Sequence, residues 1–158
     1  MTIGSRILTT DPDLLRLHKD IENDIRRYGR SVMCIGAEDD SPAFAYTIGN
    51  VNVGLPELLM IGTLDGAPLN PLSQKMIERG SAFDDGEVVS IGGKYPVKII
   101  DADERAHDDY TIQAGQYLGH EDYRVQQVLI PDKSGGYPDD PECQRPYANM
   151  PVLGHRRH

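Results

Sequence analysis

The spacing of apolar residues predicts one long amphipathic helix near the start of the chain. Between residues 11 and 29, side chains at intervals of three and four share one helical face, and these are Leu14, Leu17, Ile21, Ile25 and Tyr28. Asp11 is a suitable N-cap, Pro12 fits the first helical position, and Gly29 can end the helix. We therefore expect a helix over residues 11–29 that packs its apolar stripe against a core.

Short apolar runs bounded by turn residues predict strands in the rest of the chain. The predicted strands cover residues 31–37, 44–50, 57–62, 88–91, 97–100 and 123–130, and further helices are predicted at 70–80 and 110–118. The acidic segment 101–109 is expected to be a solvated loop. The first three strands follow one another without a helix between them, which favours an antiparallel meander, and the fourth and fifth predict a hairpin.

These elements predict an α+β fold, because helices and strands do not alternate strictly. We expect a mainly antiparallel sheet, with a barrel-like closure as one form of it, and two or three helices. From Pro131 onward, frequent prolines predict a loop region. The length of 158 residues is that of one domain, so a single globular domain over residues 1–158 is expected.

Charge and composition narrow the class of protein. The net charge is −9, from 25 acidic and 16 basic side chains, and this repels nucleic acid and anionic membrane surfaces. The sequence contains no run of about 20 apolar residues and no signal-like segment near its start. Cys34 and Cys143 are the only cysteines, too few for a disulfide framework. We expect a cytoplasmic protein with no nucleic-acid or membrane partner.

The strand FAYTIGN, residues 44–50, carries two hydroxyl groups among apolar side chains. Because side chains alternate along a strand, Tyr46 faces one side while Thr47 faces the other. One interpretation is that both hydroxyls help to line a pocket. The other is that these residues pack beneath neighbouring elements and that Thr47 bonds to the main chain.

The loop PDKSGGYPDD, residues 131–140, is a second candidate for binding. Asp132 and the glycines at 135 and 136 predict a tight turn whose main-chain N–H groups point inward and can accept an anion. Lys133 and Ser134 add further donors. An ordinary turn with a charged tip is the alternative, since no phosphate-binding P-loop pattern is present.

Metal and thiol chemistry receive little support. His107 and His120 lie among acidic residues, but the sequence has no His-Glu-x-x-His, paired Cys-x-x-Cys or EF-hand spacing, and we expect no metal site. Arg145 could lower the pKa of Cys143 and make it a reactive thiol. A space-filling role is favoured for Cys143, because no histidine neighbours it in sequence to act as a base.

Several motifs in order resemble a known family. They are F-x-Y-T-x-G at 44–49, Pro-Glu-Leu at 56–58, Gly-Lys-Tyr-Pro-Val at 93–97 and Pro-Asp-x-x-Gly-x-Tyr-Pro at 131–138. Together they resemble the bacterial family known as domain of unknown function 4262, from about Asp20 to Leu153. The resemblance implies a small bacterial, cytosolic domain and brings no established activity. Where the family pattern has histidine before Pro-Glu-Leu, this chain has Leu55.

The motifs suggest a pocket between the FAYTIGN strand and the 131–141 loop that binds a small polar or anionic ligand. The candidate ligand-binding residues are Tyr46, Thr47, Glu57, Asp132, Lys133, Ser134, Tyr137 and Arg145. Whether the protein is an enzyme is left open; if it is, Asp132 or Glu57 could act as acid or base, since burial can raise a carboxyl pKa into a useful range.

Two other functions fit the same sequence. One is a flavin- or nucleotide-dependent oxidoreductase in which Lys133 and Arg145 hold phosphate. The other is an interaction module without catalysis, whose acidic surface would meet a basic partner in a salt-sensitive contact. A homodimer through an apolar strand face is compatible with each reading. No particular cofactor follows from the residues.

Overall fold

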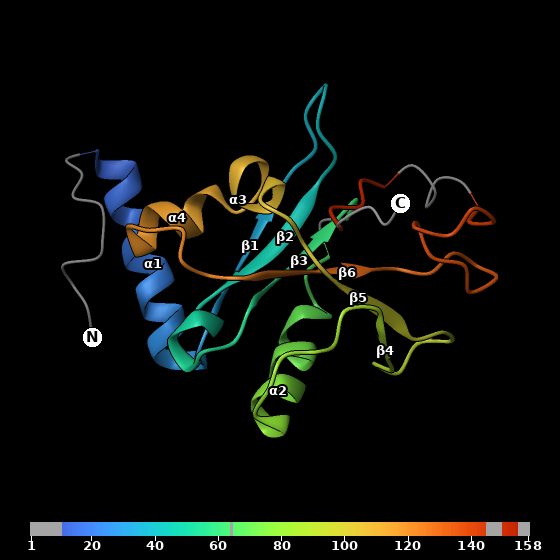
Figure 1. Ribbon diagram of the computed structural model, residues 1–158. Coiled ribbons are helices and arrows are strands. Elements are labelled where there is room, and N and C mark those ends of the chain that lie inside the picture. Colours follow the sequence, from blue (N-terminus) through green and yellow to red (C-terminus); the bar gives the residue numbers. More distant parts are fainter. Residues whose placement is uncertain (1–10, 64, 145–149, 155–158) are drawn as a thin grey trace.

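A computed structural model describes residues 11–63, 65–144 and 150–154 of the chain. Within them the protein forms a six-stranded sheet with helices on both faces (Figure 1). The strands are β1 (Ser31–Ile35), β2 (Phe44–Ile48), β3 (Glu57–Ile61), β4 (Glu87–Val89), β5 (Val97–Asp101) and β6 (Val125–Leu129). The helices are α1 (Pro12–Tyr28), α2 (Leu69–Arg79), α3 (Arg105–Asp109) and α4 (Ile112–Leu118), with a 3-10 helix at Asn50–Val53.

The strand order is β1-β2-β3-β6-β5-β4. Every neighbouring pair is antiparallel except β3 and β6, which run parallel at the centre of the sheet. The α+β prediction is therefore confirmed, as are the β1–β2–β3 meander and the β4–β5 hairpin. The sheet is open, with β1 and β4 at its edges, so the barrel-like form is not the one adopted.

Helix α1 ends as its sequence predicts. The Asp13 N–H donates to the Asp11 side chain at 2.9 Å, and Gly29 adopts a left-handed φ of 89° that closes the C-terminus. Ile21 on the inner face is 1% exposed. None of the helices in the described part of the chain combines the length and apolar content needed to cross a membrane.

Two apolar cores sandwich the sheet. On one face, β2 and β3 pack beneath α1, α3 and α4, and the buried residues there include Ile21, Tyr46, Ile48, Leu59, Ala106, Ala114 and Leu153. On the other face, α2 covers a cluster that includes Ala45, Leu58, Met60, Leu72, Met76, Ile99 and Val128. Because both faces are covered, all five residues of β2 are buried. Tyr46 and Thr47, which one interpretation of the sequence placed in the wall of a pocket, therefore lie in the interior of the protein.

Helix α3 departs from the sequence prediction of a solvated loop over residues 101–109. It has five residues, and only Ala106 among them is buried. A single apolar side chain gives no helical period, so the pattern along the chain contained no signal for it. Tertiary packing of Ala106 against the sheet explains why the helix forms here.

Candidate functional site

The hydroxyl of Thr47 belongs to a buried polar cluster around Glu57. Thr47 Oγ1 donates to Glu57 Oε1 at 2.7 Å. The main-chain N–H groups of Gly49, Asn50 and Val51 donate to the same carboxylate at 3.0, 3.1 and 3.1 Å. Glu57 has no exposed surface. Its carboxylate therefore closes the turn that leaves β2, and we call these five residues the Glu57 cluster.

Opposing influences act on the pKa of Glu57 within the cluster. Burial has the largest influence and raises the pKa of Glu57 above its usual value, while the hydroxyl and the three N–H donors offset part of this rise by stabilising the anion. Arg30 adds a positive charge nearby, and its Nε donates to Asn50 Oδ1 at 3.1 Å. Since the carboxylate is enclosed on all sides, it has no open path to a substrate and serves the structure of the turn.

Tyr46 lies on the opposite face of β2, beneath α4. Its hydroxyl donates to Gln113 Oε1 and accepts the Gln113 N–H at 3.2 Å. Burial raises the pKa of Tyr46, so the hydroxyl stays protonated and joins the start of α4 to the sheet. Tyr46 and Thr47 therefore belong to different layers of the molecule.

The loop after β6 is ordered by Asp132. Its Oδ1 accepts the N–H groups of Ser134 and Gly136 at 2.8 Å each, and its Oδ2 accepts the Gln144 N–H at 2.7 Å. These donors hold the pKa of Asp132 below its usual range. The predicted inward N–H groups are thus present, and they bind the Asp132 carboxylate. No place is left among them for an external anion.

Other contacts pin this loop onto β5. The Tyr137 hydroxyl donates to the Pro96 carbonyl at 2.8 Å, and Lys98 pairs with Asp139 at 2.7 Å. Cys143 lies buried beside the turn, where burial and the Asp132 charge raise the pKa of its thiol. A raised pKa disfavours the reactive-thiol hypothesis, which required the opposite shift.

A groove of about 1080 Å³ lies at the carboxyl ends of the parallel strands β3 and β6. The two strands run side by side in the same direction in Figure 1. After them the chain departs to α2 in one case and to the 131–144 loop in the other. Ligands in open sheets commonly bind where connections diverge from parallel strands in this way. The apolar lining includes Met60, Ile61, Ile91, Val97, Val128, Leu129 and Ile130.

Two lysines supply the positive charge of the groove. Lys94 comes from the β4–β5 link and Lys133 from the loop after β6. Neither makes an ion pair with any residue in the described part of the chain, although the Lys94 ammonium lies 5.3 Å from the centre of the Tyr95 ring. Of the acidic groups in the lining, Asp132 is held by its turn and Asp65 Oδ1 accepts the Ala67 N–H at 3.0 Å.

The structure separates most of the predicted site residues. Asp132 and Lys133 line the groove, while Ser134 and Tyr137 belong to the same loop without lining it. The residues predicted from the first half of the chain, Tyr46, Thr47 and Glu57, are fully buried and do not line the groove. Arg145 lies outside the described residues.

Sequence reasoning missed Lys94 and Tyr95 as groove residues, because the Gly-Gly-Lys-Tyr-Pro link was interpreted only as a turn. The position of the link in the ordered family motifs was the one available signal. Its approach to the 131–144 loop is close: a side chain added at Gly135, where φ is 88°, would contact the Tyr95 ring at 3.1 Å. The turn at Gly135 therefore lies close against Tyr95, and the two lysine-bearing segments are neighbours.

The histidines considered for metal binding have other partners. His107 Nε2 lies 2.6 Å from the Tyr123 carbonyl oxygen, and His120 Nδ1 accepts the Asp122 N–H at 3.0 Å. Within residues 11–63, 65–144 and 150–154, no group of three or more histidine, cysteine or acidic side chains is placed to hold a metal ion.

Comparison with known families settles the relationship that the motifs indicated. A family model described as "Domain of unknown function (DUF4262)" matches residues 24–144, which is most of the chain. The chain belongs to the DUF4262 family. No curated protein and no solved structure gives a significant match. The DUF4262 match spans the Glu57 cluster and both groove lysines. Leu55, which directly precedes the Pro-Glu-Leu motif, is 8% exposed and packs in the core on the α2 side.

Proposed function

We propose that this protein is a cytoplasmic ligand-binding domain that takes a small anionic molecule with an apolar body in the groove at the ends of β3 and β6. The observation that carries the proposal is the pair of lysines, Lys94 and Lys133, which have no ion-pair partner among the described residues and stand over apolar walls. Other exposed basic side chains of the described residues also lack an ion pair, and what distinguishes these two lysines is their place in the lining of the groove.

The dimensions and chemistry of the groove support this proposal. Small-molecule sites have volumes of about 300–1,000 Å³ and are mostly apolar with a few placed polar groups, and the groove volume of about 1080 Å³ is close to that range. Burial of apolar surface favours binding, while an ammonium fixes the position of an anionic group. Both cysteines are free thiols, which is compatible with a reducing compartment.

Binding is favoured over catalysis by the state of the carboxyl groups. Glu57 is enclosed, and Asp132 accepts three main-chain N–H bonds with its pKa lowered. A general acid or base must reach the reacting proton and must titrate near the working pH. Neither carboxyl meets both conditions, so we assign them to folding of the turns.

A nucleotide or flavin is the second candidate ligand, because the groove contains an aromatic side chain next to a lysine. Tyr95 is partly exposed and lines the groove beside Lys94, so a ring could stack on it while a phosphate meets the ammonium. Native mass spectrometry of freshly purified protein, with an absorbance scan, distinguishes this candidate. A mass excess matching a nucleotide or flavin supports it, and a clean polypeptide mass argues against a tightly retained one.

The primary test is a fluorescence titration with anilinonaphthalene sulfonate (ANS), an anion with an apolar aromatic body. We expect saturable binding that weakens about tenfold in the double variant Lys94→Gln, Lys133→Gln, equivalent to about 1.4 kcal/mol. Added salt should weaken binding to the unchanged protein more than to the double variant.

The matched control is Lys75→Gln, because Lys75 is an exposed lysine on the outer side of α2 and does not line the groove. It should leave the ANS affinity unchanged. Equal affinity in the control and in the double variant, with both folded by circular dichroism, would contradict the proposal by showing that Lys94 and Lys133 do not hold the anionic group.

A further inference from the structure

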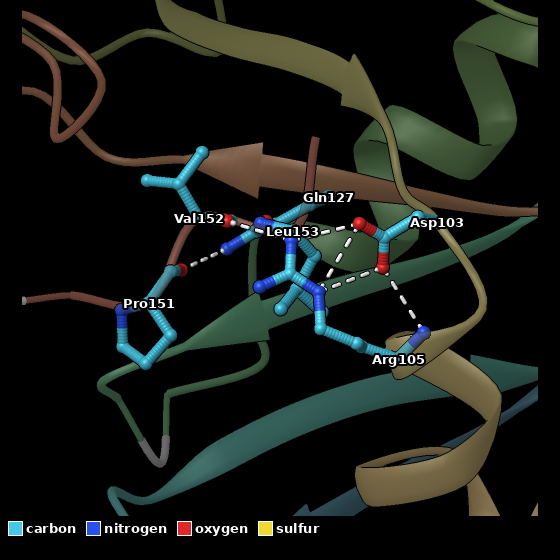
Figure 2. A network of polar contacts seen from close by, with 6 residues as sticks. All are labelled: Asp103, Arg105, Gln127, Pro151, Val152 and Leu153. Carbon is cyan, nitrogen blue, oxygen red and sulfur yellow. Dashed lines mark hydrogen bonds and ion pairs between the residues drawn. The ribbon is translucent and has the colours of Figure 1, made fainter. Parts of the chain in front are cut away.

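The segment Met150–Leu153, which we call the strap, is held along its main chain by side chains from β6 and α3 (Figure 2). Gln127 Nε2 donates to the Pro151 carbonyl at 2.7 Å, and Gln127 Oε1 accepts the Leu153 N–H at 2.8 Å. One side-chain amide thus bonds two main-chain groups of the strap. Leu153 is 3% exposed and packs in the core beneath α1, α3 and α4.

A second set of contacts holds the strap from the other side. The Asp103 N–H donates to the Leu153 carbonyl at 2.8 Å. Arg105 Nη2 donates to the Val152 carbonyl at 3.4 Å, and the same guanidinium pairs with Asp103 through Nε at 2.9 Å and Nη2 at 2.7 Å. Figure 2 shows Arg105 between the Asp103 carboxylate and the strap. The ion pair orients the arginine toward the strap.

Two residues connect the strap with the groove. Met150, at the start of the strap, and Gln127, which holds the strap, both line the groove. Met150 lies directly over Gly62 at the end of β3: a Cβ atom placed on Gly62 would be 1.9 Å from the Met150 sulfur. The position of the strap therefore determines one wall of the groove.

We propose that the strap regulates the groove, so that docking of Met150–Leu153 and binding of the anionic, apolar ligand favour each other. This inference rests on the proposed function. Met150 supplies an adaptable apolar wall, and Asp103, Arg105 and Gln127 are positioning residues that act on the ligand through it. Because coupling between two equilibria is reciprocal, ligand in the groove must in turn stabilise the docked strap. The strap lies beyond the residues matched by the family model, 24–144.

Three variants separate the steps of this coupling. Leu153→Ala removes the buried side chain that anchors the strap. Arg105→Gln removes the exposed arginine that holds the strap and leaves the core intact, so the test remains valid if Leu153→Ala folds poorly. Met150→Ala deletes the wall and leaves Arg105 in place. Arg16→Gln on the outer face of α1, an exposed arginine remote from the strap, is the matched control.

The experiment measures ANS affinity together with hydrogen–deuterium exchange of residues 150–154 in the full chain. In the unchanged protein, ANS should slow exchange of these residues. Leu153→Ala and Arg105→Gln should speed their exchange and weaken ANS binding by at least about fivefold. Met150→Ala should weaken binding to a similar degree without a comparable loss of protection, and Arg16→Gln should change neither quantity.

The outcomes distinguish failure of this inference from failure of the proposed function. If the strap variants exchange faster yet bind ANS with unchanged, lysine-dependent affinity, the coupling is overturned while the groove remains the site. If the unchanged protein shows no lysine-dependent ANS binding, the proposed function fails and the coupling fails with it.

Discussion

The Glu57 cluster and the lysine-bearing groove differ in whether their charged side chains have partners within the protein. In the cluster, a buried carboxylate accepts four hydrogen bonds, from Thr47, Gly49, Asn50 and Val51. In the groove, Lys94 and Lys133 are exposed, and neither has an ion-pair partner in the described part of the chain. A fully paired buried charge specifies a fold, whereas unpaired charges over an apolar surface are available to a ligand.

This difference teaches how to weigh polar residues within an apolar run. Thr47 and Glu57 stand out in the sequence because their neighbours are apolar. Apolar neighbours also mean that both side chains are buried, and buried polar groups must form hydrogen bonds, here with each other. Lys94 and Lys133 lie in glycine-rich turns, where charged side chains are common and therefore give no sequence signal for a binding site. The residues with chemistry to offer are those whose hydrogen-bonding capacity the fold does not use.

The largest predicted effect comes from breaking the paired region. Glu57→Gln replaces an acceptor oxygen with an N–H₂ group that faces main-chain donors, so we expect the free energy of unfolding to fall by about 3 kcal/mol. Urea denaturation measures this change. Glu78→Gln, at an exposed position on α2, is the control and should cost little. A loss of less than about 1 kcal/mol for Glu57→Gln would contradict the structural role assigned to the carboxylate.

An intermediate effect is expected where the groove meets the strap. Gly62 has a left-handed φ of 100°, and an added methyl group would collide with Met150. Gly62→Ala should lower the free energy of unfolding by about 1–2 kcal/mol from backbone strain and should weaken ANS binding by displacing Met150. Gly36→Ala is the control, because a Cβ at Gly36 meets no atom within 4 Å. Unchanged ANS affinity in folded Gly62→Ala would show that Met150 is not a wall of the ligand site.

The smallest effect concerns an exposed pair. Arg79 and Glu87 form two hydrogen bonds at 2.9 and 2.6 Å, which lower the pKa of Glu87 to about 2. A carboxyl group whose pKa is lowered in the folded state stabilises the fold at pH values above its unfolded-state pKa of about 4.3. This stabilisation is lost as the pH falls toward the folded-state pKa of about 2. Because the pair is exposed and screened, the change is small.

The urea midpoint at pH 5 and at pH 2 measures the effect of this pair. Glu87→Gln should lose less stability across that interval than the unchanged protein does. An equal loss in both proteins would show that the pair contributes nothing to acid sensitivity, and it would leave the contrast between the cluster and the groove untouched.

Most of the fold could be predicted because apolar periodicity is a local property. The helices at 12–28 and 69–79 and all six strands were predicted within a few residues of their observed bounds. The parallel pairing of β3 with β6 could not be predicted, since strand order depends on tertiary packing between segments far apart in sequence. Helix α3 was missed because Ala106 is its one buried residue.

The candidate site could be predicted only in part. Asp132 and Lys133 were identified from the turn chemistry of their loop, and both line the groove. The apolar wall residues come from strands β3, β5 and β6 and from the β4–β5 link, which also carries Lys94. Strands β3 and β6 and the β4–β5 link are far apart in the sequence and come together only when the sheet is assembled. The alternative in which Thr47 bonds to the main chain describes its observed contacts better than the pocket interpretation, because Thr47 Oγ1 accepts the Leu58 N–H at 3.0 Å. The same hydroxyl also donates to the Glu57 side chain.

The most direct test of the contrast between the two regions is an amide proton–nitrogen NMR titration of the labelled protein with ANS. We predict that the amide signals of groove residues such as Gly62, Gly92 and Leu129 shift with a common affinity, and that those of Gly49, Asn50 and Val51 do not. Shifts concentrated at the three amides that bind Glu57, with the groove signals unchanged, would contradict the assignment of the groove as the ligand site.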